Sequence, residues 1–435
     1  MDVPRKIRLS FSYSGNKYLD FVVNAILILG FGYKLLIFIE KLCSPDINRY
    51  TYTELLINYA GGFVRRGLTG QLLYDCCSYF GLPVITVIQF ICIISFIIVC
   101  VFLFYYFNKK NYCWWLLLSP LFLSLTTSII RKDFFLYIVL IVINLLIVRL
   151  TKHKSNMWVI CLLMVFGLLI HETFIFWAIP VSVLLMASYN TGKVNFIIGL
   201  GVVLICAVIV FYFKGTAESA YMIRESWNSS GLLTETLIPI KENSIGALEW
   251  DTVETFKTHI RKNFYSISFG WAGIPIRIIG WVAIYYLLTN FLFVFQRRNK
   301  DDHEKPTGNM LNRKTDLSIL FIFNTICLLP MFLFLSNDWG RIYQYAVMGS
   351  FIPFLIIPEE RLNAIFSRNI RGRVERFNRF LCNVLKPNVF LMCFLLLIIG
   401  VSPSSFLLPE AYMKSPLGSV SLFVQWIVYS ICGNI

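Results

Sequence analysis

Long apolar runs with few charges restrict the folds open to this chain more than any other feature of its sequence. The run over residues 84–107, for example, contains no acidic or basic residue. A helix needs about 20 apolar residues to cross the hydrocarbon core of a bilayer. Hydrophobic residues make up 57% of the 435 residues and charged residues only 14%, which exceeds the apolar content that a soluble core requires. The sequence therefore predicts an all-α polytopic membrane protein, a single integral membrane domain over residues 1–435.

One span for each run of about 20 residues gives about twelve transmembrane helices. We expect them at residues 19–42, 84–107, 112–130, 134–150, 156–170, 173–189, 194–213, 268–295, 317–335, 342–358, 389–401 and 418–432. The segment 156–189 has two interpretations, one long interrupted helix or a re-entrant pair, and Pro180 within it is an expected kink point.

The basic residues between the runs predict the orientation of the chain. The N-terminal segment with Arg5 shares a side with the loops that carry Lys109, Arg149 and Arg298. Loops rich in Lys and Arg face the cytoplasm under the positive-inside rule, so both termini are expected to be cytoplasmic. The same distribution accounts for the formal net charge of +15. The charge therefore reflects membrane topology, and no nucleic-acid partner is expected.

Three segments between the runs stand out. Residues 43–83 form the first external loop. Residues 214–265 form a long external loop, which we expect to contain short interfacial helices and to act as a lid, a binding element or a mobile insert. Residues 359–388 mix arginine with phenylalanine, and we expect a cytoplasmic surface helix lying on anionic lipid. Membrane lipids are therefore expected partners.

A glycine-rich stretch with two adjacent arginines lies in the first external loop. Gly61, Gly62 and Gly67 surround Arg65 and Arg66, and apolar residues at helical spacing follow. Glycines let a backbone approach a ligand closely, and guanidinium groups beside a helix N-terminus attract anions. The stretch therefore predicts an anion site that opens an amphipathic helix. The competing interpretation is an interfacial loop whose arginines reach lipid headgroups.

The glycine spacing also imitates a phosphate-binding P-loop. Leu68, however, occupies the place of the essential lysine, and no strand precedes the loop. Nucleotide hydrolysis is therefore excluded, while a diphosphate remains a suitable ligand.

A His-Glu pair and two short charged turns interrupt the later apolar runs. His171 and Glu172 end one run, and a general base or a structural ion pair are equally open interpretations. Two further clusters, Arg131-Lys132-Asp133 and Asp338-Trp339-Gly340-Arg341, are either tight external turns or cationic contacts to a diphosphate, with Trp339 available to stack on a sugar. All of them are expected at the outer face, which predicts one site built from several helix ends.

Other ionisable residues give weaker signals. Arg277 is expected well inside a span, where it pairs with an acid or a ligand phosphate. Asp46, Glu54 and Asp75 are candidate bases in the first external loop, although a solvated surface carboxylate is the favoured interpretation of each. The 4 histidines lie far apart and the 12 cysteines are scattered, so no metal site and no cofactor is expected.

Three motifs together resemble those of a known group of membrane proteins. They are Gly61-Gly62-Phe63-Val64-Arg65-Arg66-Gly67, His171-Glu172 and Asp338-Trp339-Gly340-Arg341. The chain resembles Wzy-type O-antigen and capsular polysaccharide repeat-unit polymerases, which are similar in architecture to the membrane glycosyltransferases of the GT-C class. The resemblance covers most of the chain as hydropathy and only these short motifs as sequence.

The resemblance implies metal-independent glycosyl transfer at the outer face of the bacterial inner membrane, in the synthesis of lipopolysaccharide or capsule. A glycan on undecaprenyl diphosphate is the implied donor, a lipid-linked repeat unit the implied acceptor, and a chain-length regulator protein a partner that the family allows. Arg65 and Arg66 would hold the donor diphosphate. His171 or Glu172 would be the base, and Arg341 with Arg131 or Arg277 would hold the second phosphate.

Other functions compete with polymerisation. A lipid-linked oligosaccharide flippase also has many spans and a cationic cavity, but it needs charges through the depth of the bilayer and commonly two similar halves. The sequence has no internal repeat, and its charged clusters crowd at one face, which favours an enzyme. A GT-C transferase that takes single sugars from a polyprenyl monophosphate, and a membrane scaffold without chemistry, are further alternatives.

Overall fold

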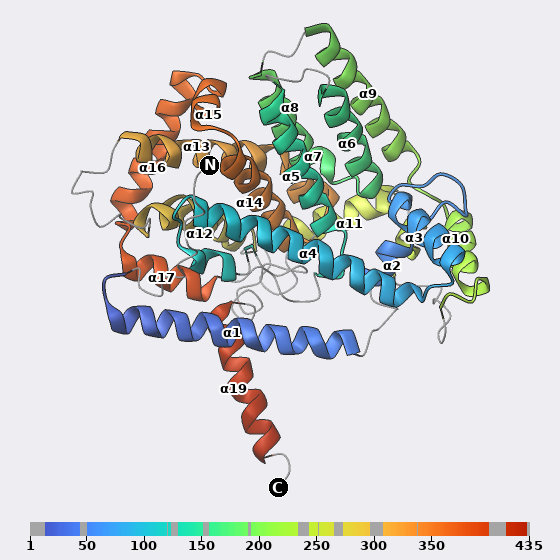
Figure 1. The fold of residues 1–435 in the computed structure, drawn as a ribbon, viewed down its shortest axis with the longest axis horizontal. Helices are drawn as coiled ribbons and strands as arrows, with labels where there is room; N and C mark the ends of the chain where they lie inside the picture. The colour runs from blue at the N-terminus through green and yellow to red at the C-terminus, as the bar shows by residue number, and fades with distance from the viewer. Residues whose placement is uncertain are drawn as a thin grey trace, which may run out of the picture.

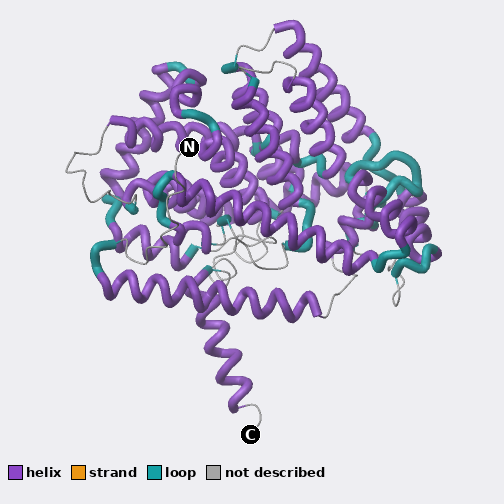
Figure 2. Tube along the Cα trace, viewed as in Figure 1, coloured by secondary structure: helices purple, strands orange, loops and turns teal. Residues whose placement is uncertain are grey.

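The computed structural model describes residues 14–43, 50–119, 121–122, 129–150, 156–189, 193–233, 243–250, 252–264, 273–295, 308–336, 338–399 and 415–432. Over these ranges the chain is built of helices and their connections, and no strand occurs among them (Figure 2). The predicted all-α class is therefore confirmed for the described part of the chain.

The helices follow one another along the chain as shown in Figure 1. In order they are α1 (Lys17–Cys43), α2 (Tyr50–Leu56), α3 (Gly67–Phe80), α4 (Val84–Lys109), η1 (Trp114–Leu118), α5 (Asp133–Arg149), α6 (Asn156–Ile170), α7 (Phe174–Trp177), α8 (Ile179–Ala187), α9 (Lys193–Tyr212), α10 (Ala217–Ser229), η2 (Gly246–Leu248), α11 (Thr252–Phe264), α12 (Gly273–Val294), α13 (Gly308–Cys327), η3 (Met331–Leu335), α14 (Trp339–Ile356), α15 (Glu359–Ile365), α16 (Arg368–Leu385), α17 (Val389–Ile398) and α19 (Pro416–Cys432).

Several helices are long and apolar enough to cross a membrane. In the described ranges these are α1, α4 and residues Asn195–Tyr212 of α9, and α16 with α17 adds a fourth if that pair, bent by 94°, counts as one span. The structure thus supports association with a membrane. The figure of about twelve spans stays a prediction, because other apolar helices are shorter, such as Asn156–Ile170.

The expected spans 112–130 and 173–189 are not continuous helices, whereas the expected span 156–170 coincides with α6. Residues 112–130 contain only the short η1 within their described part, and 123–128 lie outside the described residues. The segment 156–189 breaks at 171–173 and again at Ala178, just before Pro180. Proline has no N–H to donate and its ring clashes with the preceding turn, so it begins α8 instead of continuing α7. The segment is therefore divided into α6, α7 and α8, and how it crosses a membrane stays a prediction.

Helix α4 shows how the apolar runs pack. One stripe faces the protein while the rest of the surface, including Phe90 and Val101, is largely exposed. The buried residues recur every three or four positions: Val84, Ile88, Cys92, Ser95, Val99, Leu103 and Phe107. This spacing places them on one side of a helix. A helix with one buried side and an apolar exposed side fits contact with lipid tails.

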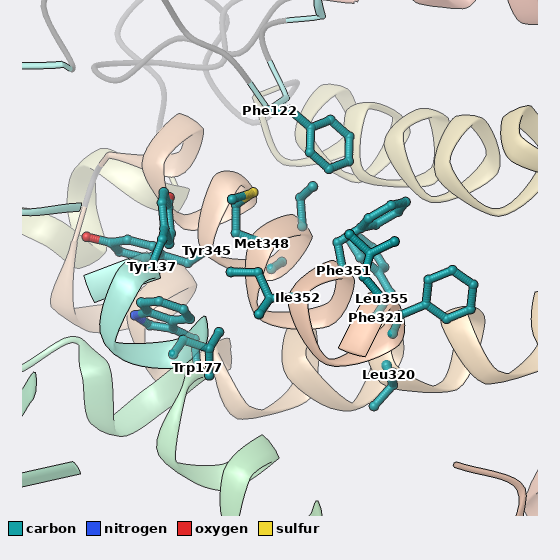
Figure 3. Close-up of a cluster of buried hydrophobic side chains, with 14 of the residues drawn as sticks. Phe122, Tyr137, Trp177, Leu320, Phe321, Tyr345, Met348, Phe351, Ile352 and Leu355 are labelled. Carbon is teal, nitrogen blue, oxygen red and sulfur yellow. The ribbon is translucent and has the colours of Figure 1, made fainter. Parts of the chain in front are cut away.

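The largest core surrounds α14 (Figure 3). The rings of Trp177 and Tyr345 stack with centroids 5.0 Å apart and an angle of 4° between their planes. Phe122 packs edge-on against Phe351 at 4.8 Å. Offset and edge-to-face pairs add to the area that aromatic side chains bury. Helices α5, α7 and α13 reach the same core, so α14 has a closely defined position.

A second, smaller core joins α2 and α3 to α10 and η2. Leu55, Leu73 and Ile223 are buried in it together with Trp227. The indole Nε1 of Trp227 donates a hydrogen bond of 2.7 Å to the carbonyl of Leu56. The short helices expected in 214–265 are present as α10, η2 and α11, and α10 packs on α2 and α3.

Figure 1 shows how the two ends of the molecule differ. Helices α1 and α4 run across the view, with α2, α3 and α10 near one end and α15 and α16 at the other. The polar helix ends described below lie beside α2 and α3. The basic segment 359–388 forms two helices, α15 and α16, and its contact with lipid stays a prediction.

Candidate functional site

The polar clusters that the sequence placed at one face do come together. Arg66 directly precedes α3, and His171 directly follows α6. Lys132 precedes α5, and Arg341 lies in the first turn of α14. The segment 214–265 joins them through α10, where Ser219 Oγ donates to the carbonyl of Gly61 at 3.1 Å. Four helix ends and the glycine-arginine loop before α3 therefore share one site.

Arg66 and Glu172 form the tightest ion pair of the site. Nε of Arg66 lies 3.0 Å from Oε1 and 2.8 Å from Oε2 of Glu172, and Nη2 also donates to Oε1. Arg65 contributes a longer contact, 3.8 Å from Nη1 to the same Oε1. Burial would raise the pKa of Glu172, but Arg66, His171 and Arg65 together outweigh it and hold this pKa well below its usual value.

Glu54 lies at the centre of the site with none of its surface exposed. Its Oε1 is 3.0 Å from Nε2 of His171, 3.5 Å from Nη2 of Arg341 and 3.6 Å from Nη1 of Arg66. The contact with His171 is short enough for a hydrogen bond but poorly aligned, and within the described residues neither oxygen of Glu54 has a well-aligned hydrogen-bond partner. A buried carboxylate without a well-aligned hydrogen bond is rare, and its oxygens are suited to accept a hydrogen bond from a polar ligand. Burial would raise the pKa of Glu54, but the neighbouring charges, Arg341 foremost, hold it well below its usual value.

The tautomer of His171 follows from its neighbours. Its Nδ1 accepts a hydrogen bond from the N–H of Thr173 at 3.2 Å, so the proton of the neutral ring lies on Nε2. Burial, together with the charge of Arg66, lowers the pKa of His171 to about 4. At neutral pH His171 therefore presents an N–H to the region of Glu54 and has no free lone pair there.

Lys132 is fully buried but contacts the backbone of the glycine loop. Its Nζ donates a hydrogen bond of 2.7 Å to the carbonyl of Arg66. Arg66 has φ of 66°, in the left-handed region that non-glycine residues rarely occupy. Burial lowers the pKa of Lys132 to about 7. The sequence placed Lys132 among the ligand contacts, whereas in the structure it supports a strained residue.

Asp133 connects the site to the aromatic core. It accepts hydrogen bonds from Nε of Arg341 at 3.0 and 3.1 Å and from Nη2 at 2.8 Å. The hydroxyl of Tyr345 donates to the same carboxylate. Since the ring of Tyr345 stacks on Trp177, the packing of α14 fixes the direction in which Arg341 points.

Arg131 and Asp338 form an outer ion pair, 3.4 Å from Nη1 to Oδ2. Asp338 also caps α14, because its Oδ1 accepts from the N–H of Arg341 at 3.3 Å. Burial raises the pKa of Asp338 to about 6 despite the charge of Arg131. Trp339 begins α14, but its side chain lies outside the described residues.

The glycines of the loop serve packing within the protein. A Cβ at Gly61 would lie 2.6 Å from the backbone of Ser219, and one at Gly67 would lie 2.2 Å from the ring of Tyr59. Gly62 has φ of 87°, which favours glycine. The expected close approach of this backbone to a ligand is therefore replaced, at Gly61 and Gly67, by close approach to α10 and to Tyr59.

The other sequence candidates lie apart from this group or outside the described residues. Arg277 is in the second turn of α12, closer to the helix end than expected, and its side chain is not described. Asp46 is not described either. Asp75 is exposed and accepts from Gln71 at 2.8 Å. Glu54 belongs to the site, although the sequence favours a solvated surface carboxylate for it. The one indication in the sequence is that Glu54 is the single charged residue of α2.

The site contains nearly equal numbers of opposite charges. Its basic side chains are Arg65, Arg66, Arg131, Lys132 and Arg341, and its acidic ones are Glu54, Asp133, Glu172 and Asp338. Arg65 is the basic side chain most open to solvent, with 28% exposed. Among the described residues no group of three or more His, Cys, Asp and Glu is placed to bind a metal ion. The arrangement suits an anionic ligand and a hydroxyl group.

This chain matches none of the protein families, characterised proteins or solved structures with which it was compared.

Proposed function

We propose that this protein is a membrane glycosyltransferase of the polysaccharide-polymerase type. It would transfer a glycan from undecaprenyl diphosphate to a lipid-linked repeat unit at the outer face of the bacterial inner membrane. The support is the meeting of the glycine-arginine loop, His171-Glu172 and the Asp338–Arg341 turn in one site. These are the motifs on which the resemblance to such polymerases rests.

The observation that carries the proposal is the buried carboxylate of Glu54, which has charged neighbours but no well-aligned hydrogen bond among the described residues. A sugar hydroxyl bound there would donate its proton to Glu54 and accept from Nε2–H of His171. We therefore assign Glu54 as the general base, in place of His171 or Glu172. Glu172 fits this role less well, because both of its oxygens accept from Arg66.

The reaction then follows from the positions of the charges. The hydroxyl oxygen of the acceptor attacks the anomeric carbon of the donor, and its proton passes to Glu54. The bond between the anomeric carbon and the diphosphate oxygen breaks, and the electron pair leaves with the diphosphate. Arg65, the most exposed cation, would meet the diphosphate first, and Arg66 and Arg341 would stabilise its added charge.

The test is transfer by the purified full-length protein in liposomes, supplied with an oligosaccharide on undecaprenyl diphosphate. We expect a ladder of longer lipid-linked glycans and release of undecaprenyl diphosphate. Glu54→Gln should lower the rate by about 10²- to 10⁴-fold, the usual contribution of a general base. Arg65→Gln should mainly weaken the binding of the donor.

Asp75→Asn is the matched control, because Asp75 belongs to the same loop but is exposed and bonded only to Gln71 among the described residues. It should retain full activity. Full activity of Glu54→Gln would contradict the assignment of the base. Release of undecaprenyl monophosphate from a monophosphate-linked sugar would identify the single-sugar transferase, and movement of the lipid without transfer would identify a flippase.

The proposed orientation places α3 outside and α16 in the cytoplasm. It can be tested by single cysteines at Tyr79 and Asn383, in a chain whose native cysteines are replaced by serine, because both positions are exposed. In intact spheroplasts a membrane-impermeant maleimide should label Tyr79→Cys and leave Asn383→Cys unlabelled until the cells are opened. The reverse pattern would refute the orientation.

A further inference from the structure

Helix α16 carries a second polar system, at the end of the molecule away from α2 and α3 (Figure 1). Its inward side is anchored to α12 and α13. Arg371 pairs with Asp316, which is 2% exposed. Asn378 accepts from the hydroxyl of Tyr285 at 2.6 Å and donates to Ser318 at 3.0 Å. These bonds settle which side of α16 faces the helix bundle.

A second side of α16 is apolar and exposed. Successive residues of a helix are turned by about 100° from one another. At this spacing one stripe, next to the anchored side, collects Ile370, Phe377, Phe380 and Val384. Their exposed fractions are 44%, 36%, 61% and 60% respectively. Large apolar side chains aligned on one exposed stripe mark a contact surface.

Exposed arginines lie within and beside this apolar stripe, because at about 100° per residue Arg373 falls between Val384 and Phe380, and Arg376 falls next to Phe380. Arg373, Arg376 and Arg379 are exposed, and no described acidic side chain lies within ion-pair distance of them. Arginine beside an apolar stripe is the composition of helices that lie in the interface of an anionic leaflet.

The angle between α16 and α17 is consistent with α16 lying along the membrane surface. After Leu385 the chain turns, and α17 runs at 94° to α16. Helix α17 is apolar throughout, with the sequence VFLMCFLLLI. If α17 enters the hydrocarbon region, α16 lies parallel to the membrane surface.

We propose that α16 binds the anionic lipids of the adjacent leaflet, with its apolar stripe inserted among the acyl chains and Arg373, Arg376 and Arg379 on the phosphate groups. This surface is independent of the charged site at the other end. The bonds of Arg371 and Asn378 to the bundle fix the rotation of α16, so the insertion needs no folding of the helix on contact.

The test places a photo-cross-linking benzophenone amino acid in the full-length protein, in nanodiscs of equal parts phosphatidylglycerol and phosphatidylcholine. Val384 is the test position, and its neighbour Asn383, exposed and turned away from the stripe, is the matched control. Lipid adducts are counted by mass spectrometry. We expect several times more adducts at position 384 than at 383, and an excess of phosphatidylglycerol among them.

The second measurement removes positive charge from α16 and asks whether the excess of phosphatidylglycerol among the adducts falls. In the Val384 cross-linking chain, Arg373→Gln with Arg376→Gln should lower the preference for phosphatidylglycerol, by up to about fivefold for each arginine, while adducts still form. Equal adduct yields at positions 383 and 384 would overturn the insertion of the stripe. An unaltered chain that shows no preference between the two lipids would overturn the role of the arginines.

Discussion

The ammonium group of Lys132 holds the carbonyl of Arg66 at 2.7 Å, and Arg66 is one of three non-glycine residues with positive φ in the described chain. The two facts belong together. A left-handed backbone costs an ordinary residue about 1–2 kcal/mol, and a hydrogen bond from a buried cation offsets a cost of that size. The direction of the Arg66 side chain, towards Glu172, depends on this backbone conformation.

Lys132→Met should therefore lower the free energy of unfolding by about 1–3 kcal/mol, because it leaves the Arg66 carbonyl unpaired in a buried place. The measurement is urea unfolding in detergent micelles. In an Arg66→Gly background the same change should cost less, because glycine adopts positive φ without strain. Equal costs in both backgrounds would show that Lys132 does not support the conformation of Arg66.

Arg66→Ala should cost about 3–5 kcal/mol of unfolding free energy, because it leaves the buried carboxylate of Glu172 without its main partner. Adding Glu172→Gln should restore part of the loss, since the uncompensated charge is then gone. The same urea titration measures both. If the double variant is as unstable as the sum of the two single variants, the pair is not coupled.

His171 makes stability depend on pH. Its pKa is about 4 in the folded chain and about 6.5 when unfolded, so the unfolded chain binds more protons between these values. Stability is therefore complete above about pH 6.5 and falls as the pH drops towards 4, by about 1.4 kcal/mol per unit. The groups facing the ring are Glu54, Glu172, Arg66 and Arg341.

His171→Gln is the comparison for this prediction, because glutamine cannot take up the proton. Asp338, whose pKa is raised to about 6, shifts stability in the opposite sense between about pH 4 and 6, but it does so in both chains. The difference between the two unfolding curves should therefore shrink from pH 7 to pH 4. A difference independent of pH would exclude a buried neutral His171.

Gly67→Ala should destabilise the fold by about 1–3 kcal/mol, the usual cost of overpacking, because the new methyl group would lie 2.2 Å from the ring of Tyr59. Gly32→Ala in α1 is the control, since nothing lies within 4 Å of a Cβ there. It should be neutral or slightly stabilising, because alanine favours helices. Thermal unfolding midpoints of the two variants in detergent decide the matter.

Much of the architecture could be predicted because it depends on local patterns. The apolar runs produced α1, α4 and α9 with nearly the expected bounds, and the break at His171 was visible as charge within an apolar stretch. The start of α3 after Arg66 followed from glycines before a helical pattern.

The rest depended on contacts between distant segments. Glu54 looks like a surface carboxylate until the ends of α3, α6 and α14 bring Arg66, His171 and Arg341 around it. Lys132 contacts the backbone of a residue 66 positions away, which no spacing rule indicates. The glycines of the loop were attributed to a ligand because their close neighbours, Tyr59 and Ser219, cannot be identified from the sequence.

Because acids and bases in the site are nearly balanced, an anion that binds there must displace carboxylates from arginines. Because Arg66 and Arg341 already have carboxylate counter-ions, an incoming anion must exchange with them instead of filling a vacant positive charge. Separating a buried ion pair is costly, and chloride, with one charge, gains too little to do so. A diphosphate carries several charges on neighbouring oxygens and can replace more than one carboxylate at once. If the proposed diphosphate donor binds here, the site would therefore favour it over singly charged anions such as chloride.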